Sequence, residues 1–433
     1  MRIGIDYTAA ARQRAGIGRY ARELITALLA LEAPIPSTSL RASPGPSPAR
    51  GGGESRQYVI FAAVGGLEAG SWKLEVGQLC STVQHLTSNL QPPISNLQFR
   101  TLPISDDWLA RLWQRLRLPV PVEAITGALD VFYSPDFVLP PTLPRTRTLL
   151  TVHDLSFLRC PDAFVPALRR YLERVVPRSI ARAERVLADS EATRADLVAL
   201  LGALPEKVQV LYSGVHPRFR PQPEPGEAER VRARYGLGDA PYALSVGTLQ
   251  PRKNYPRLIQ AFAHLRTGES ANQRMANGGS QTCRLADLQL VIAGGRGWLY
   301  EETLAEAGKH AARVRVLGFV DDGDLPALYR NAALFVFPSL YEGFGLPVLE
   351  AMACGVPVIC SNASSLPEVA GDAALLVDPL DTDGLAAAMA RVLGDVGLRQ
   401  QMIARGFAQA ARFTWEKAAR QLLAAFDALG RNA

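Results

Sequence analysis

The chain has 433 residues, of which 48% are hydrophobic, and its net charge is +6. This length allows two or three domains, and the composition is that of a globular protein rather than a disordered or fibrous one. No apolar run approaches the roughly 18 residues that a membrane-spanning helix needs. The five cysteines are scattered without metal-ligand spacing, which favours a reducing compartment. Because the N-terminus enters a strand at once and has no signal-peptide pattern, we expect a cytoplasmic protein.

Residues 1–212 are predicted to form a first α/β domain. A short strand at residues 2–6 and a helix at residues 17–31 come first. Further strands are expected at 58–64, 131–133, 148–151, 185–188 and 208–211, with helices at 165–183 and 192–200. Short apolar strands that alternate with longer helical patterns predict a parallel sheet covered by helices.

A Pro-rich segment at residues 216–226 is predicted to link this domain to a second α/β domain, residues 213–405. Its strands are expected at 242–246, 288–293, 314–317, 334–338, 356–360 and 374–377. An amphipathic helical pattern runs over residues 398–429, and residues 406–433 are assigned to a helical tail.

Three stretches have the composition of insertions. Residues 34–56 are rich in Pro, Ser, Gly and Arg, residues 68–98 hold a short repeat (SNLQ), and residues 267–284 are polar. Such compositions predict disordered or surface loops, and we assign no function to them.

The most informative segment is residues 342–350, with the sequence EGFGLPVLE. It follows an apolar run that predicts a buried strand, and Pro347 stands where a helix should begin. Free N–H groups at a helix start attract phosphate, and carboxylates such as Glu342 and Glu350 can accept hydrogen bonds from sugar hydroxyls. The segment therefore predicts a site for a nucleotide sugar.

This pattern, with further motifs in matching order, resembles the retaining glycosyltransferases of the GT4 family. The further motifs are residues 16–19 (GIGR), 151–154 (TVHD), 188–190 (ADS), 246–254 (VGTLQPRKN), 291–295 (VIAGG) and 317–320 (LGFV). The resemblance covers most of the chain and implies the α/β GT-B fold. In that fold two Rossmann-like, doubly wound parallel-sheet domains face a cleft, and a C-terminal helix crosses back to the first domain.

Adjacent cations, Arg252 and Lys253, follow a predicted strand and a Gly-Thr turn that begins at Gly247. Two such charges can neutralise a diphosphate leaving group, whose charge grows in the transition state. The alternative is a solvated pair in a surface loop. The resemblance favours the catalytic role and implies a reaction without a metal or other cofactor, and no acidic Asp-x-Asp motif is evident in a matching place.

For the segment that holds the two glutamates, the resemblance implies individual roles. Glu342 would contact a hydroxyl of the transferred sugar, and Glu350 would hold the ribose of the nucleotide. Other donor contacts would come from Gly343, Phe344, Gly345 and Leu346, and from Gly318 and Phe319 of the LGFV motif. Glycine at 343 and 345 lets the backbone approach a ligand closely.

Two motifs of the first domain are also candidates. His153 follows a predicted strand, and the carboxyl end of a strand in an open α/β sheet is where ligands bind. The neighbouring Asp154 is either an acceptor contact or a helix cap. Gly16 and Gly18 precede a long helix, where the backbone can approach phosphate, although a tight turn explains them equally well.

Five of the six excess positive charges lie in residues 1–212, which favours contact with an anionic membrane surface or acceptor. Residues 108–117 alternate apolar and basic residues and fit either an interfacial membrane helix or, preferably, a helix that faces the core. No nucleic-acid partner is expected.

Together these observations predict a glycosyltransferase that moves a hexose from a nucleoside diphosphate sugar to a hydroxyl of a glycan or lipid-linked acceptor. The opening residues 4–6 and 16–20 and residues 152–155 resemble bacterial mannosyltransferases of polysaccharide assembly, which favours GDP-mannose and leaves UDP-glucose open. Two alternatives are a sugar-nucleotide 2-epimerase of the GT-B fold and a catalytically silent nucleotide-sugar-binding protein.

Overall fold

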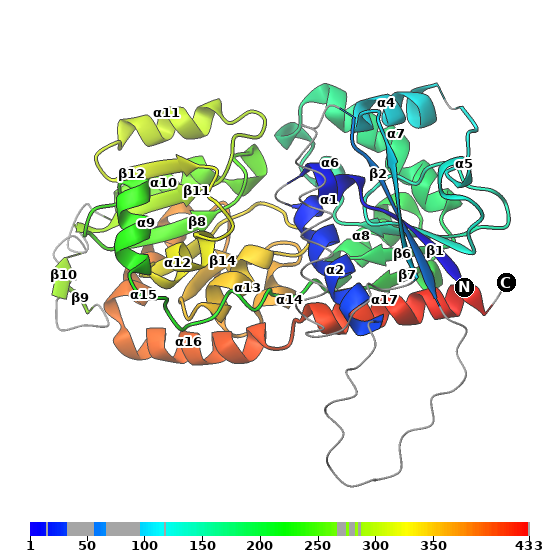
Figure 1. The fold of residues 1–433 in the computed structure, drawn as a ribbon. Helices are drawn as coiled ribbons and strands as arrows, with labels where there is room; N and C mark the ends of the chain where they lie inside the picture. The colour runs from blue at the N-terminus through cyan, green and yellow to red at the C-terminus, as the bar shows by residue number, and fades with distance from the viewer. Residues whose placement is uncertain are drawn as a thin grey trace, which may run out of the picture.

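The computed structural model describes residues 1–13, 16–32, 56–65, 96–116, 118–265, 274–276, 282–284 and 287–431. Two α/β domains lie side by side, and each is built around a parallel sheet with helices packed against it (Figure 1). This architecture confirms the α/β fold with two parallel sheets that the strand and helix patterns predict. The exact division at residues 212 and 213 stays a prediction.

Among the described residues, the first sheet has seven parallel strands in the order β3-β2-β1-β4-β5-β6-β7. Their bounds in that order are Leu97–Leu102, Gln57–Ala63, Arg2–Asp6, Val131–Ser134, Arg147–Val152, Arg185–Ala188 and Val208–Val210. Strand β1 pairs with both β2 and β4, so the strand order reverses there. In open parallel sheets, ligands bind beside the carboxyl ends of the strands at such a point.

Helices pack on both faces of this sheet because successive strand side chains point to opposite faces. Tyr58 and Ile60 of β2 join one hydrophobic cluster, whereas Val59 and Phe61 join the other. The helices are α1 (Thr8–Arg12), α2 (Ile17–Glu32), α4 (Asp106–Ala110), α5 (Glu123–Thr126), α6 (Ser156–Arg159), α7 (Pro166–Arg182) and α8 (Glu191–Leu201), with a π-helical turn η2 (Arg111–Arg115) and 3-10 turns η3 (Pro161–Ala163) and η4 (Pro205–Lys207).

The second sheet has six parallel strands among the described residues, in the order β12-β11-β8-β13-β14-β15. Their bounds in that order are Val314–Gly318, Gln289–Ala293, Tyr242–Val246, Leu334–Phe337, Val358–Ser361 and Ala374–Val377. The order reverses between β8 and β13, which places a second ligand-binding edge at their carboxyl ends. The helices are α9 (Glu227–Tyr235), α10 (Tyr255–His264), α11 (Glu301–Lys309), α12 (Leu325–Arg330), α13 (Leu346–Ala353), α14 (Leu366–Ala370), α15 (Thr382–Gly394) and α16 (Val396–Ala410), with a 3-10 turn η5 (Pro251–Lys253).

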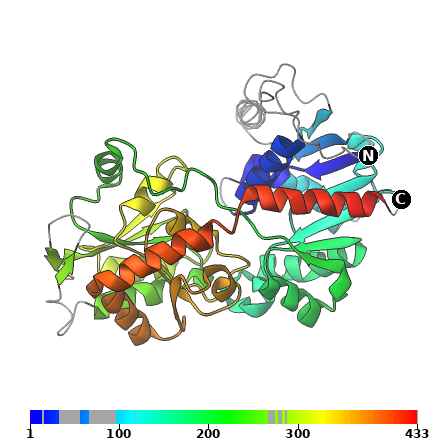
Figure 2. The same ribbon diagram turned by 90° about the horizontal axis from the view of Figure 1, so that it is seen from below.

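A last helix, α17 (Trp415–Gly430), leaves the second domain and packs on the first, as the GT-B resemblance implies (Figure 2). The Thr414 hydroxyl accepts a hydrogen bond from the Lys417 N–H and so begins a new helix. The predicted amphipathic helix over residues 398–429 is therefore two helices, α16 and α17. Beside this break, the Val215 N–H donates to the Phe413 carbonyl (3.0 Å), so the two chain segments that join the domains run side by side.

The predicted insertions need correction where the structure describes them. Residues 97 and 98 begin β3, which pairs with β2 along its whole length, so they belong to the sheet. Residues 274–276 and 282–284 form a two-stranded antiparallel ribbon, β9 (Arg274–Ala276) and β10 (Thr282–Arg284). Arg56 pairs with Glu32 and Asp427 and therefore joins β2 to α17. The other residues of the three stretches lie outside the described part of the chain.

The segment 108–117 contacts the core, as the preferred alternative predicted, but it does so as the end of α4 and the π-helical turn η2 rather than as one regular helix. Leu109 is buried, and Trp113 packs partly against the core of the first domain. Trp108 and Leu116 are 54% and 64% exposed. The segment thus covers the core with one side and presents large apolar side chains to solvent with the other, while residue 117 lies outside the described residues.

Candidate active site

A cavity of about 1310 Å³ lies between the two domains and is lined by residues of both. Its walls include Asp6 and Asp136, which stand at the carboxyl ends of β1 and β4, and Gly247 and Glu342, which follow β8 and β13. The points at which the strand order of each sheet reverses, called switch points below, therefore open into the same cavity, as expected for doubly wound sheets that face each other.

The loop that carries Glu342 is fixed by two serines of the segment before α14. The Glu342 N–H donates to the Ser364 hydroxyl (2.8 Å), and the Ser365 hydroxyl donates to the Glu342 carbonyl (2.9 Å). Gly345 has a φ of 113° and caps the N-terminus of α13, where a residue with a side chain would be strained. The carboxylate at 342 is consequently held in one place relative to the helix start.

Glu342 lies between the two predicted cations. Arg252 Nη1 is 2.8 Å from its Oε2, and Lys253 Nζ is 2.5 Å from its Oε1. Burial raises the pKa of the Glu342 carboxyl, but the charges of Arg252 and Lys253 outweigh burial and lower the pKa to about 2. Burial also lowers the pKa of Lys253 to about 8, although Glu342 partly offsets it. The sequence thus predicted three residues that the structure brings into direct contact.

Local backbone geometry explains why the two cations reach this position. Asn254 follows them with a φ of 59°, and its side-chain amide donates to the carbonyls of Pro338 and Pro379. These bonds tie the end of η5 to the segments that follow β13 and β15. Lys253 also lies over the ring of Phe337, with Nζ 4.8 Å from the ring centroid, a cation–π contact that helps to hold the ammonium in place.

Glu350, on the first turns of α13, is almost fully buried and makes a contact that spans the cleft. Arg19 Nη2 of α2 lies 2.6 Å from its Oε1, and Tyr329 donates a hydrogen bond to its Oε2 (3.0 Å). The Arg19 guanidinium also lies over the ring of Phe219, 5.1 Å from its centroid. The predicted ribose carboxylate therefore faces the cavity beside a cation of the first domain.

His153, at the end of β5, lies in the cavity wall with both ring nitrogens engaged. Nδ1 is 2.8 Å from the Asp189 carboxylate, and Nε2 is 3.0 Å from the Pro135 carbonyl. The Pro135 carbonyl accepts only, and so does the Asp189 carboxylate when it is ionised, so the two contacts favour an imidazole that donates from both nitrogens and is cationic. Burial lowers the pKa of His153, but Asp189 and Asp136 outweigh burial and raise the pKa to about 9.

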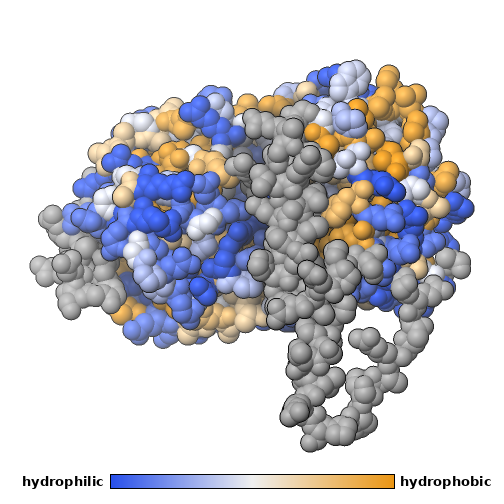
Figure 3. Space-filling view, viewed as in Figure 1, coloured by the Kyte–Doolittle hydropathy of each residue, from blue (hydrophilic) through white to orange (hydrophobic). Residues whose placement is uncertain are grey.

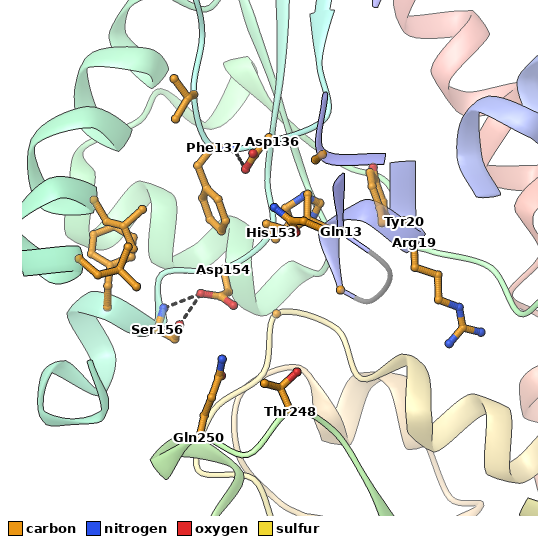
Figure 4. A pocket seen from close by; sticks show the side chains of 18 of the residues that line it. Gln13, Arg19, Tyr20, Asp136, Phe137, His153, Asp154, Ser156, Thr248 and Gln250 are labelled. Atoms are coloured by element: carbon orange, nitrogen blue, oxygen red, sulfur yellow. Dashed lines mark hydrogen bonds between the residues drawn. The ribbon is translucent and has the colours of Figure 1, made fainter. Parts of the chain in front are cut away.

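Asp154 next to it binds the first residue of the short helix α6, whose N-cap position is held by Leu155. Its Oδ1 accepts hydrogen bonds from the Ser156 N–H (2.8 Å) and the Ser156 hydroxyl (2.6 Å), as Figure 4 shows. Of the two roles considered for Asp154, the helix cap is present only as a contact with the first helical residue, made from one position before the N-cap. Because Asp154 also lines the cavity, an acceptor contact stays a prediction.

The two domains touch directly at the loop that carries Glu342. A Cβ at position 343 would clash with the carbonyl oxygen of His153, so only glycine permits this approach. Thr193 Oγ1 donates to the carbonyls of both His153 and Gly343 (3.2 and 3.3 Å). Tyr341 adds a hydrogen bond to Asp196 of α8 (2.6 Å). These contacts dock the loop that carries Glu342 on the end of β5.

Most predicted site residues line this cavity. They are Gly16, His153, Asp154, Gly247, Arg252, Lys253, Phe319, Glu342, Gly343, Phe344, Gly345, Leu346 and Glu350. The structure places two predicted donor glycines outside the lining. Gly18 packs against the carbonyls of Gln13 and Ala9, where a side chain would not fit, and Gly318 takes a φ of 74° at the end of β12. The roles of all these residues in catalysis and binding stay predictions.

Several cavity residues were missed by the sequence reasoning. Asp136 and Gln250 are examples, and Figure 4 shows them on opposite sides of the cavity, with Thr248 beside Gln250. Asp136 follows β4 at the switch point, so its position after a predicted strand was a usable signal. Burial raises the pKa of Asp136, and it raises the pKa of the nearby Asp6 to about 6.

Comparisons with known proteins agree with the geometry of this site. The family model "Glycosyl transferases group 1" matches residues 227–409, and "Glycosyltransferase Family 4" matches residues 82–219. The O-antigen chain mannosyltransferase B of Escherichia coli is 38% identical over 69% of this chain and 74% of its own length. The chain belongs to this glycosyltransferase family and is a glycosyltransferase.

Other relatives are similar over smaller parts. A serotype-specific mannosyltransferase, WbdA of Escherichia coli, is 30% identical over 65% of this chain and 34% of its own length. A D-inositol 3-phosphate glycosyltransferase of Salinispora tropica is 35% identical over 56% of this chain and 51% of its own length.

Solved structures show the fold. Sucrose-phosphate synthase from Thermosynechococcus elongatus aligns with a TM-score of 0.68 at 18% identity over the whole of both chains. HepE of Anabaena, solved in complex with UDP and glucose, aligns with a TM-score of 0.66 at 17% identity, over 99% of this chain and all of that one. The GT-B fold that the resemblance implied is confirmed.

Proposed function

We propose that this glycosyltransferase transfers mannose from GDP-mannose to a hydroxyl of a glycan or lipid-linked acceptor and retains the anomeric configuration. The observation that carries the proposal is the Glu342 carboxylate held between Arg252 and Lys253, in a cavity between two switch points. The mannosyltransferase names of the relatives support mannose as the sugar and an O-antigen-like polysaccharide as the product class.

The same cluster supports leaving-group stabilisation by the protein itself. The two cations are buried and fixed, so their charge acts at short range on a diphosphate with little reorganisation. We therefore expect transfer to persist in the presence of EDTA. Phosphate oxygens would also meet the free N–H groups at the start of α13, which points into the cavity.

Protonation states in the cavity support a retaining course. A pKa of about 2 makes Glu342 a poor base, and the cationic His153 has no lone pair with which to accept a proton. We infer that the departing phosphate oxygen takes the proton of the acceptor hydroxyl. The bond from C1 to the phosphate oxygen breaks, the bond from C1 to the acceptor oxygen forms on the same face, and GDP leaves with the proton.

Asp322 supports guanine as the base of the donor. It lines the cavity, its charge acts on Arg19 together with that of Glu350, and its carboxylate lies 3.6 Å from Arg218. Guanine presents two adjacent donors, N1–H and N2–H, on one edge, and a carboxylate can accept from both. Uracil offers only N3–H between two carbonyls, so a carboxylate at this position discriminates against UDP sugars.

A lipid-linked acceptor would bring the protein to a membrane surface. Among the described residues, no helix is long and apolar enough to cross a bilayer. Trp108, Leu116, Leu118 and Val120 are instead exposed apolar residues that lie close to Arg111 and Arg115 in the sequence. Apolar residues gather at the upper right in Figure 3, on the side where α4 lies. Such a surface fits peripheral binding to anionic lipids, which flotation with phosphatidylglycerol vesicles would test.

The decisive experiment incubates purified protein with GDP-mannose or UDP-glucose and octyl α-mannoside in EDTA, and follows products by NMR. We expect an α-linked disaccharide from GDP-mannose, because GDP-mannose is itself an α-glycoside. A β-linked product would overturn retention, and product from UDP-glucose alone would overturn the donor. Incubation of the donor without acceptor tests the epimerase alternative, which predicts an epimerised nucleotide sugar.

A further inference from the structure

A tryptophan of the donor domain is embedded in the acceptor domain. Trp298 lies in the loop between β11 and α11, and its Nε1–H donates to the Ala163 carbonyl of the first domain (2.7 Å). Its ring lies 5.4 Å from the ring of Phe164, tilted by 39°, and packs against the hydrophobic cluster of the first domain. Both rings also line the cavity between the domains.

The loop that carries Trp298 is joined to the loop that carries the catalytic cations. The Leu249 N–H donates to the Gly295 carbonyl (2.9 Å), and the Gly297 N–H donates to the Leu249 carbonyl (3.1 Å). Leu299, directly after Trp298, has a φ of 52°, which is strained for a residue with a branched side chain. Strain of this kind persists where the surroundings enforce it, often at functional sites.

A buried polar group lies in the same pair of loops. The side chain of Gln250 lines the cavity but is only 8% exposed, and its Oε1 has no hydrogen-bond partner among the described residues. A Cβ at position 297 would lie 2.8 Å from Gln250 Cγ, so Gly297 leaves room for this side chain. Figure 4 shows Gln250 extending into the cavity toward Asp154. A buried carbonyl oxygen without a partner is costly unless a ligand satisfies it.

We propose that Trp298 and Gln250 form a subsite for the acceptor sugar: the sugar ring lies against the indole, and one of its hydroxyls hydrogen-bonds to the side-chain amide of Gln250. This proposal rests on the proposed function and specifies its acceptor side. A hexose has an apolar C–H face and a polar rim, so an aromatic wall with one amide matches both. Phe164 of the first domain, whose ring contacts Trp298, extends the aromatic wall.

The subsite has an unusual origin, because its two defining residues belong to the domain that binds the donor. Trp298 reaches the acceptor side only when the two domains are docked as in this structure. The acceptor subsite therefore requires the two domains to be docked as they are in this structure.

The test compares wild type with Trp298→Ala, Trp298→Phe and Gln250→Ala, using octyl α-mannoside as the acceptor probe. We expect Trp298→Ala to raise the acceptor KM about tenfold or more, and Gln250→Ala to raise it about fivefold. The KM for GDP-mannose should stay within about twofold, and Trp298→Phe should recover much of the acceptor affinity because it keeps an aromatic face. Phe407→Ala, on α16 and outside the cavity lining, serves as the matched aromatic control.

A second readout does not depend on turnover. Saturation-transfer NMR with octyl α-mannoside and GDP should show a signal with wild type and Trp298→Phe that Trp298→Ala loses, while GDP still raises the melting temperature of all three. Equal acceptor signals for wild type and Trp298→Ala, or none with wild type, would overturn the subsite. Loss of GDP stabilisation in wild type would instead contradict the proposed donor, so the two failures are distinguishable.

Discussion

The guanidinium of Arg19 and the carboxylate of Glu350 form an ion pair of 2.6 Å between the two domains. Glu350 is 1% exposed and Arg19 is 14% exposed, so little water screens the pair. If Glu350 binds the ribose of the donor, the same carboxylate senses both the nucleotide and the position of the first domain. Binding of the donor would then alter a contact that holds the domains together.

Replacing Arg19 with methionine should destabilise the protein by about 3 kcal/mol, because it leaves the buried Glu350 carboxylate without its cation. Urea unfolding followed by tryptophan fluorescence measures the change. Arg420→Met is the matched control, since Arg420 pairs with Glu416 on the surface of α17 and should change stability by less than about 0.5 kcal/mol. Equal effects of the two substitutions would contradict the importance of the cross-domain pair.

Activity should fall as the pH rises through about 8, because the charge of Lys253 is needed to neutralise the leaving diphosphate and its pKa is about 8. The relevant measurement is kcat/KM for GDP-mannose against pH, which reports groups of the free enzyme. In Lys253→Arg this alkaline limb should move to higher pH, because a guanidinium stays charged. If the alkaline limb is unchanged in Lys253→Arg, the fall in activity belongs to another ionisable group.

Stability should also depend on pH through His153, whose pKa is raised from 6.5 to about 9 in the folded protein. A raised pKa means that the folded state holds the proton more tightly, so the stabilisation is complete below pH 6.5 and is lost as the pH rises through 9. Asp189→Asn should weaken this dependence of the free energy of unfolding on pH, as measured by urea titrations at a series of pH values. NMR of labelled imidazole nitrogens should show His153 protonated at pH 7.5, and a neutral ring there would refute the assignment.

Gly343→Ala should keep the domains from docking, since its methyl group would meet the His153 carbonyl. We expect transfer to fall at least about a hundredfold, because a small displacement of reacting groups is costly. Small-angle scattering should show a larger radius of gyration than in wild type. Gly295→Ala, where a Cβ meets open space, is the glycine control and should leave the scattering unchanged.

Asp322→Asn should weaken GDP binding about tenfold, since an amide accepts through one oxygen only and its NH₂ group opposes the guanine donors. UDP binding should change by less than about twofold. Calorimetric titration with both nucleotides gives the two ratios. Equal losses for GDP and UDP would show that Asp322 contacts a part common to both, such as the ribose.

The contacts between Glu342, Arg252 and Lys253 could be anticipated because each residue lies in a local pattern of strand, turn and helix. Such patterns fix where a strand ends, and switch points then bring the ends together. The partners of Arg19 and Trp298 could not be anticipated, since both contacts depend on how two domains dock. No periodicity or turn signal near either residue specifies a partner on the other domain.

The bounds of the strands show the same contrast between features that a local pattern predicts and features that it does not. Strand β1 and strand β15 have the predicted bounds, because each is a short apolar run between clear turn signals. The first two residues of β3, Leu97 and Gln98, fell within the predicted insertion at residues 68–98, because they end the SNLQ repeat and the strand lies at the edge of the sheet. An edge strand buries less of its surface, so its pattern is weaker.

The position of α17 has a consequence for synthesis. Trp415, Leu422 and Phe426 complete the hydrophobic cluster that β1 and α2 begin, yet they are translated after the entire second domain. An apolar face of the nascent first domain therefore stays exposed until the ribosome has synthesised the rest of the chain. Residues 1–212 expressed alone would keep that face exposed and should be prone to aggregation, whereas supplying α17 as a separate peptide should rescue their solubility.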